Sequence, residues 1–186
     1  FPTRRSSDLI EEAWDKAYEA DPVSIFGGIV AFNEPIHASV AEKLSKIFLE
    51  IIIAPAFDED AFEILSKKKN IRLMQLDTSL EVNAKYKVTN VNDGLLVQDI
   101  DDHKITAEDL RCVTNRKPTE EELEQLLFAW KVVKHVKSNA IVLVKDNMTI
   151  GVGAGQMNRV GAAKIAIEQA GEKAKGSIMK IGRAHV

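Results

Sequence analysis

The chain has 186 residues, of which 45% are hydrophobic, 25 are basic and 28 are acidic, so its formal net charge is −3. This composition supports a substantial core and excludes a disordered chain, while the charge gives no general attraction to nucleic acid or to an anionic membrane. The sequence contains no run of about eighteen apolar residues, the length that a membrane-spanning helix needs. The single cysteine, Cys112, excludes an internal disulfide and favours a reducing compartment, so we expect the cytoplasm and a buried or half-buried thiol.

The first half of the chain alternates predicted helices and strands. Residues 9–20 have apolar side chains at helical spacing, and Asp21-Pro22 ends that helix. In a later helix, over 58–68, the spacing directs Phe62 and Leu65 inward. The remaining predictions for this half are a helix over 39–48 and strands over 29–32, 51–53 and 71–76.

The second half begins with a predicted hairpin, in which Asp93-Gly94 separates two extended segments and residues 94–100 form a strand half covered by protein. Thr119 and Glu122 have the spacing of a capping box, and an apolar stripe ending at Val133 follows them. Strands over 140–144 and 148–152, a turn at Asp146-Asn147 and a helix over 158–174 complete the predictions. The alternation indicates an α/β fold.

A glycine-spaced turn, Gly151-Val-Gly153-Ala-Gly155, joins the last predicted strand to the last helix. Alternate glycines let backbone N–H groups approach a ligand closely, and the start of a helix favours an anion. Arg159 adds a planar fork of donors. The structural alternative is a strand-end turn without a ligand, and the third glycine of a dinucleotide-binding fingerprint is missing at its required spacing.

Several separate motifs carry a family resemblance. Ser24-Ile-Phe-Gly-Gly28, Ile51-Ile-Ile-Ala-Pro55, Gly94-Leu-Leu-Val-Gln98-Asp99 and Val136-Lys-Ser-Asn139, followed by Gly151-Val-Gly-Ala-Gly-Gln156-Met-Asn-Arg159, resemble the bifunctional purine biosynthesis proteins. These proteins join an IMP cyclohydrolase to an AICAR transformylase. The similarity covers roughly 9–179 and lies in the transformylase half, so we expect a partial transformylase domain there, with non-native extensions at 1–8 and 180–186.

The resemblance implies a cytidine deaminase-like α/β transformylase fold, incomplete at both ends. It also implies formyl transfer from 10-formyltetrahydrofolate to the 5-amino group of AICAR, in a parent protein that is a homodimer. The AICAR-binding residues implied are Phe26, Gly27, Glu50, Asn139 and Arg159, with Gln156 as a folate contact. The structural alternatives to these ligand-binding roles are a core residue for Phe26, a surface carboxylate for Glu50, a helix C-cap for Asn139 and a solvated side chain for Arg159.

The catalytic residues of the family are a Lys-His pair just upstream of the segment matched by Leu9. The sequence FPTRRSSD occupies that place here, and Lys134-His135 is a different position in the family pattern, so we assign no catalytic residue. The alternative function is therefore a non-catalytic nucleotide-binding or assembly fragment. The four histidines are scattered without metal-ligand spacing, and we expect no bound metal.

Overall fold

The computed structural model describes residues 6–77 and 85–182, which divide into two compact units. The first unit contains the described residues of 1–14 and 22–104, and the second contains those of 15–21 and 105–186. Helices and strands occur in both units, so the expected mixture of α and β structure is confirmed. Within the described residues, no helix is both long and apolar enough to cross a bilayer.

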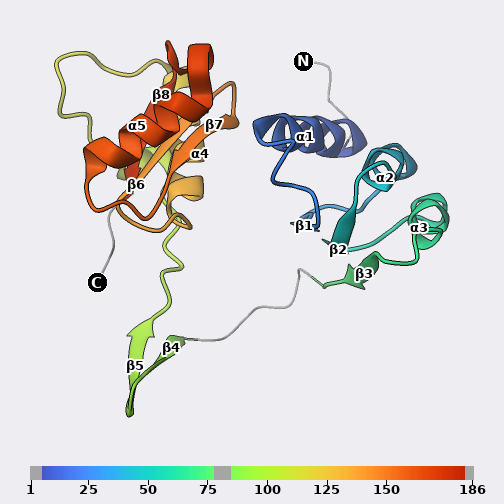
Figure 1. Ribbon diagram of the computed structural model, residues 1–186. Coiled ribbons are helices and arrows are strands. Elements are labelled where there is room, and N and C mark those ends of the chain that lie inside the picture. Colours follow the sequence, from blue (N-terminus) through green and yellow to red (C-terminus); the bar gives the residue numbers. More distant parts are fainter. Residues whose placement is uncertain (1–5, 78–84, 183–186) are drawn as a thin grey trace. The chain divides into compact units, whose positions relative to one another are not determined.

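A three-stranded parallel sheet, in the order β1-β2-β3, forms the centre of the first unit. Helices α1, α2 and α3 lie on the same side of it (Figure 1). The core between these layers includes the fully buried Leu44, Ile52 and Leu65, and Trp14 contacts Phe32 with ring centroids 6.2 Å apart. The elements are α1 (Ser6–Ala20), β1 (Gly28–Ala31), α2 (Ala38–Ser45), β2 (Leu49–Ala54), α3 (Glu59–Ser66) and β3 (Arg72–Gln75), and residues 15–20 of α1 are grouped with the second unit.

The inward face of α3 differs from the prediction at one position. Leu65 is buried as expected, but Phe62 is 55% exposed and Ala61 takes the inward position. Ala61 and Leu65 are four residues apart and therefore lie on one helix face, whereas Phe62 points about 100° away from Ala61. The spacing of Phe62 and Leu65, three residues apart, is compatible with one inward face, but the small Ala61 shares the inward face with Leu65 instead.

The hairpin predicted at Asp93-Gly94 is confirmed as β4 (Tyr86–Val91) and β5 (Gly94–Asp99), two antiparallel strands. Asn92 enables the tight reversal with a positive φ of 45°. Every residue of both strands is exposed. The expectation that 94–100 is half covered by protein is therefore wrong for the described residues. An apolar pattern indicates that a strand can be buried, but it does not show whether another part of the chain covers it.

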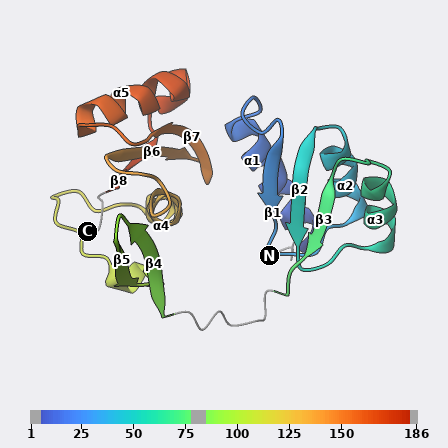
Figure 2. The ribbon, with the colours of Figure 1, turned by 60° about the horizontal axis from the view of Figure 1, so that its bottom comes forward.

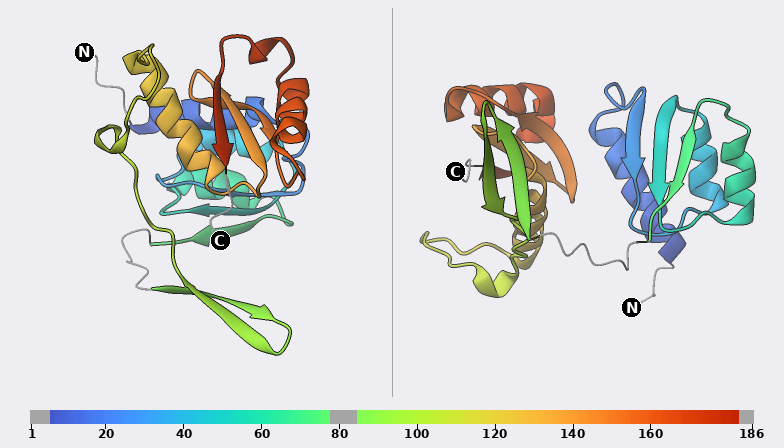
Figure 3. Two further views of the ribbon diagram at one scale, coloured as in Figure 1. Left: turned by 90° about the vertical axis from the view of Figure 1, so that its left-hand side faces the viewer. Right: turned by 90° about the horizontal axis from the view of Figure 1, so that it is seen from below.

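In the second unit, an antiparallel sheet in the order β7-β6-β8 lies between two helices. Figures 2 and 3 show α4 on one face of this sheet and α5 on the other. The five residues from Ala140 to Val144 are all buried, as a strand covered on both faces requires. The elements are η1 (Ala107–Asp109), α4 (Glu120–Val133), β6 (Ala140–Lys145), β7 (Met148–Gly153), α5 (Arg159–Ala170), η2 (Gly171–Ala174) and β8 (Ile178–Gly182).

Strand β8 was not predicted from the sequence. It pairs with β6 from Ile178 opposite Val144 to Gly182 opposite Ala140. Residues 180–182, expected to belong to an appended extension, thus form hydrogen-bonded sheet in this structure. In a strand, Ile178, Lys180 and Gly182 face one side and Met179 and Ile181 face the other. Five residues are too short a pattern to predict a strand, and the pairing with β6 is what identifies it.

The capping box at the start of α4 is confirmed. The Thr119 hydroxyl accepts from the Glu122 N–H at 3.2 Å, and the Glu122 carboxylate accepts from the Thr119 N–H at 2.9 Å. Arg116 donates both terminal guanidinium nitrogens to the same carboxylate, at 2.8 and 2.9 Å. The Arg116 hydrogen bonds, with help from the Thr119 N–H, lower the pKa of Glu122 to about 2.

We expect this pair to make the start of α4 acid-sensitive. Because folding lowers the pKa of Glu122, its ionised carboxylate stabilises the folded state fully at a pH above the unfolded carboxyl pKa of about 4.3. This stabilisation is lost as the pH falls towards 2 and the carboxylate is protonated. Glu122→Gln should therefore lower Tm near neutral pH, and the difference from wild type should shrink steadily as the pH falls from about 5 to about 2. Thermal unfolding followed by circular dichroism from pH 7 to pH 2 measures this, with Glu121→Gln as control. A difference that stays constant over that range contradicts it.

Candidate functional site

Three predicted ligand residues lie at or beside the amino ends of β1 and β2. Phe26 is 74% exposed, so it is not a core residue, and its ring lies 5.1 Å from that of Phe48 at an angle of 44°. Gly27 has a φ of +71° and donates its N–H to the Phe48 carbonyl at 2.8 Å. These contacts fix the backbone under an exposed aromatic face, which is suited to stacking on a flat ligand.

Glu50 lies on the neighbouring strand at an irregularity of the sheet. Gly28 pairs with Leu49 but Ile29 pairs with Ile51, so Glu50 is the extra residue of a bulge. Its side chain is exposed. Bulges redirect side chains and are frequent beside functional sites, and this one presents an exposed carboxylate two residues after Phe48, whose ring contacts Phe26.

Two of the turn glycines have a structural role that differs from the expected ligand cradle. A Cβ at Gly153 would lie 1.9 Å from the carbonyl oxygen of Ala162, and a Cβ at Gly151 would lie 2.1 Å from that of Ala166. Both glycines are buried in β7 against α5. The strand therefore needs glycine there so that the helix can approach, and neither residue is placed to contact a ligand.

Gly155 and Asn139 hold the turn that follows. Gly155 has a φ of +64° and donates to the Lys137 carbonyl at 2.6 Å. The Asn139 backbone exchanges two hydrogen bonds with Gln156, and its side-chain nitrogen donates to the carbonyls of Gln156 and Met157, at 3.0 and 3.2 Å. Both side-chain N–H groups are thus used internally, which leaves Oδ1 as the group that Asn139 can offer to a ligand.

The remaining anion-binding features gather at the start of α5. Asn158 caps the helix by accepting from the Gly161 N–H at 2.7 Å. Arg159 is exposed, and no ion pair joins it to a carboxylate in the described part of the chain. The first N–H groups of a helix have no partner within it and favour an anion. The Lys137 side chain, which sequence reasoning missed, passes beside Gly155 and adds a second cation.

Other candidates contribute less. Gln156 is half-buried and donates to the Ala154 carbonyl at 3.0 Å, so its amide nitrogen is already engaged. His37 contacts Asp58, and His135 is exposed near the end of α4, while His185 lies outside the described residues. In the described ranges, no group of three or more His, Cys, Asp or Glu residues could hold a metal ion.

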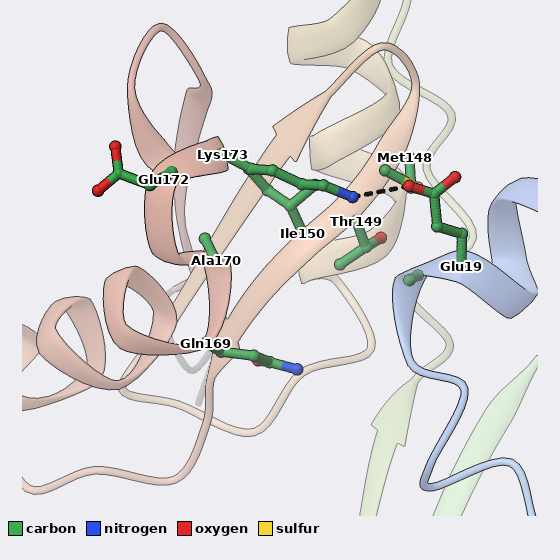
Figure 4. A pocket seen from close by; sticks show the side chains of 9 residues that line it. Glu19, Met148, Thr149, Ile150, Gln169, Ala170, Glu172 and Lys173 are labelled. Atoms are coloured by element: carbon green, nitrogen blue, oxygen red, sulfur yellow. Dashed lines mark hydrogen bonds and ion pairs between the residues drawn. The ribbon is translucent and has the colours of Figure 1, made fainter.

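A hollow of about 230 Å³ in the second unit lies apart from all of these residues. Figure 4 shows Lys173 and Glu19 pointing towards each other across it, and their side chains form an ion pair at 2.7 Å. Because Glu19 neutralises Lys173, this hollow has no cation available for a phosphate.

Comparison with known proteins identifies relatives. Residues 5–169 match the family described as AICARFT/IMPCHase bienzyme. A relative from Anoxybacillus flavithermus, "Bifunctional purine biosynthesis protein PurH", is 63% identical over 172 residues, which are 92% of this chain and 34% of the relative. Proteins of the same name from Oceanobacillus iheyensis and Bacillus subtilis are 57% and 60% identical, over 92% and 91% of this chain and 34% and 33% of their own lengths.

The chain thus spans about a third of the length of these curated relatives. The residues matched by the family run from the start of α1 into the last turn of α5, and they include every predicted ligand residue. On the strength of that match, the chain belongs to the AICARFT/IMPCHase bienzyme family.

Proposed function

We propose that this chain is the AICAR-binding part of a transformylase that acts in purine biosynthesis. The observation that supports it most is the exposed Arg159, which pairs with no carboxylate among the described residues and lies at the start of a capped helix, next to a turn held by Asn139. A phosphate there would receive helix N–H groups and a bidentate guanidinium. The family description, AICARFT/IMPCHase bienzyme, and the name of the relatives, bifunctional purine biosynthesis protein, support the same role.

The other ligand residues fit the rest of the nucleotide. The carboxamide of AICAR carries N–H donors, which suit the Asn139 Oδ1 that the turn leaves unused. The resemblance also implies Phe26 and Glu50, which belong to the first unit, and their exposed ring and exposed carboxylate have the chemistry to bind a flat imidazole and ribose hydroxyls. Gln156 retains its carbonyl oxygen for a folate.

The proposed reaction joins the AICAR amine to the formyl carbon of 10-formyltetrahydrofolate. The new C–N bond forms as the bond to the folate nitrogen breaks, and the amine proton passes to a base while tetrahydrofolate leaves with a proton on that nitrogen. The amine is a weak nucleophile, so a histidine base and a lysine facing the developing oxyanion are needed. The resemblance places this Lys-His pair upstream of Leu9, so we expect binding without turnover from the present sequence.

Further properties follow from the same resemblance. We infer a cytidine deaminase-like fold, a cytoplasmic location and a homodimeric parent that is also an IMP cyclohydrolase. The transformylase reaction requires no metal in this proposal. The competing function is nucleotide binding without chemistry, and a formyl-transfer assay separates the two.

Arg159→Ala is expected to weaken AICAR binding by about 10- to 150-fold, because a charge-assisted hydrogen bond contributes about 1.5–3 kcal/mol. Calorimetric titration of the wild type and the variant with AICAR measures this. Lys164→Ala, which removes an exposed cation further along the same helix, should leave the affinity unchanged. A folded wild type that does not bind AICAR would overturn the proposal, and turnover with 10-formyltetrahydrofolate would overturn the need for the upstream pair.

A further inference from the structure

A groove of about 810 Å³ lies in the second unit between α4, β8 and the loop that precedes α4. We call it the α4–β8 groove. Its volume falls within the range of small-molecule sites, about 300–1,000 Å³. None of the predicted AICAR-binding residues lines it. It is therefore a separate surface whose use the proposed function does not explain.

The floor of the α4–β8 groove is apolar. Leu123, Leu126 and Trp130 from α4 line it together with Ile178 from β8, and all four remain partly exposed. On the loop side, Val113 is 82% exposed. The apolar stripe of α4 is thus only partly covered by the described residues, and a ligand with an apolar body would remove more of it from water.

The rim of the groove carries an excess of positive charge. Its lining includes Arg111, Arg116, Lys117 and Lys180 but a single carboxylate, Glu122, which Arg116 already engages in two hydrogen bonds. No ion pair joins the other three cations to a carboxylate in the described part of the chain. This local excess contrasts with the net charge of −3 for the whole sequence. The groove is complementary to an anion.

Lys180 links the apolar floor to the charged rim. Its Nζ lies 3.6 Å from the centroid of the Trp130 ring, which is a cation–π contact. Partial burial lowers the pKa of Lys180. An anion beside this ammonium group would offset the cost of its burial.

We propose that the α4–β8 groove binds a small amphipathic anion, with a ring-bearing apolar body on the Leu126 and Trp130 floor and an acidic group facing Arg111 and Lys117. The acidic group is a carboxylate, sulfonate or phosphate, since guanidinium and ammonium groups bind all three. The site is independent of Arg159 and of AICAR binding.

Cys112 provides a direct readout of occupancy. It is the one cysteine of the chain, its thiol is exposed rather than buried as the sequence suggested, and it lines the groove. Its alkylation by iodoacetamide, a small neutral reagent, can be followed by mass spectrometry. The probe is 1-anilinonaphthalene-8-sulfonate, an aromatic anion, and N-phenyl-1-naphthylamine is its uncharged counterpart. At ten times its Kd, the anionic probe should slow alkylation about tenfold by mass action.

The charge-reversal pair Arg111→Glu with Lys117→Glu should weaken protection by the anionic probe at least about tenfold, which corresponds to about 1.4 kcal/mol. Both side chains are exposed, so the fold should persist, and circular dichroism checks this. The matched control is Lys131→Glu with Lys164→Glu, two exposed lysines outside the groove that change the net charge equally. This control and Arg159→Ala should both keep full protection.

Three results would overturn the proposal. They are no slowing of alkylation by the anionic probe, equal slowing by the uncharged probe, and protection that survives the charge reversal at Arg111 and Lys117. The first would indicate that the groove is a surface for another part of a longer polypeptide. Because Arg159→Ala should leave protection intact, failure of the AICAR proposal remains distinguishable from failure of this one.

Discussion

Gly153→Ala is expected to lower the free energy of unfolding of the second unit by about 3 kcal/mol, the upper end of the usual cost of overpacking. The added methyl group would lie 1.9 Å from the Ala162 carbonyl oxygen, while ordinary contacts begin at 3.4 Å. The obstacle is the backbone of α5, so no side-chain rotation can relieve it. The helix would have to retreat by about 1.5 Å and lose its close contact with β7.

The retreat would be costly because small residues line the whole contact. Ala162, Ala166 and Ala170 are buried on the α5 face that meets the sheet, and Gly151 and Gly153 are their partners on β7. Moving the helix outward would open voids beside Ile141 and Leu143, which belong to the same cluster. The substitution therefore overpacks one point and underpacks the rest.

Urea unfolding followed by circular dichroism measures this effect. The matched control is Gly94→Ala, because the nearest atom to a Cβ there is 3.8 Å away and the backbone has no positive φ. It should change stability by no more than about 0.5 kcal/mol, as surface substitutions do. If Gly153→Ala is as mild as Gly94→Ala, the two turn glycines serve something other than helix packing.

The elements themselves followed well from the sequence. Within the described residues, periodicity located five helices and seven of the eight strands, and the Thr119 capping box fixed the start of α4. The end of α2 was placed three residues too late, at 48 rather than at Ser45, because Ile47 and Phe48 continue the apolar pattern into the next turn. Local pattern specifies local structure, and it is weakest at element ends.

Properties that depend on neighbours could not be predicted in the same way. Gly151 and Gly153 resembled a phosphate cradle, and only the position of the α5 backbone shows that they accommodate a helix. The exposure of Cys112 and of the whole β5 strand depends on what lies beside them, which periodicity does not contain. For Asn139, the sequence indicated a polar anchor, while the hydrogen bonds determine which of its two atoms remains for a ligand.

Asn139→Asp is expected to disrupt the turn before α5 and, with it, AICAR binding. Aspartate has the shape of asparagine but replaces the donating nitrogen with an acceptor. At 3.0 and 3.2 Å from the carbonyl oxygens of Gln156 and Met157, two attractive contacts would become repulsive. Leaving partly buried polar groups unpaired costs about 1–3 kcal/mol, so we expect a loss in the upper half of that range.

The same substitution at Asn158 is the control, because Asn158 acts as an acceptor. Its Oδ1 receives the Gly161 N–H at 2.7 Å, and an aspartate keeps that bond and adds a favourable negative charge at the start of α5. Asn158→Asp should therefore leave Tm unchanged or slightly higher, although its charge should weaken binding of an anionic nucleotide nearby. Thermal unfolding separates the two variants. Equal Tm values for Asn139→Asp and Asn158→Asp would mean that the Asn139 side chain does not hold the turn through its nitrogen, and its proposed orientation towards AICAR would have to be reversed.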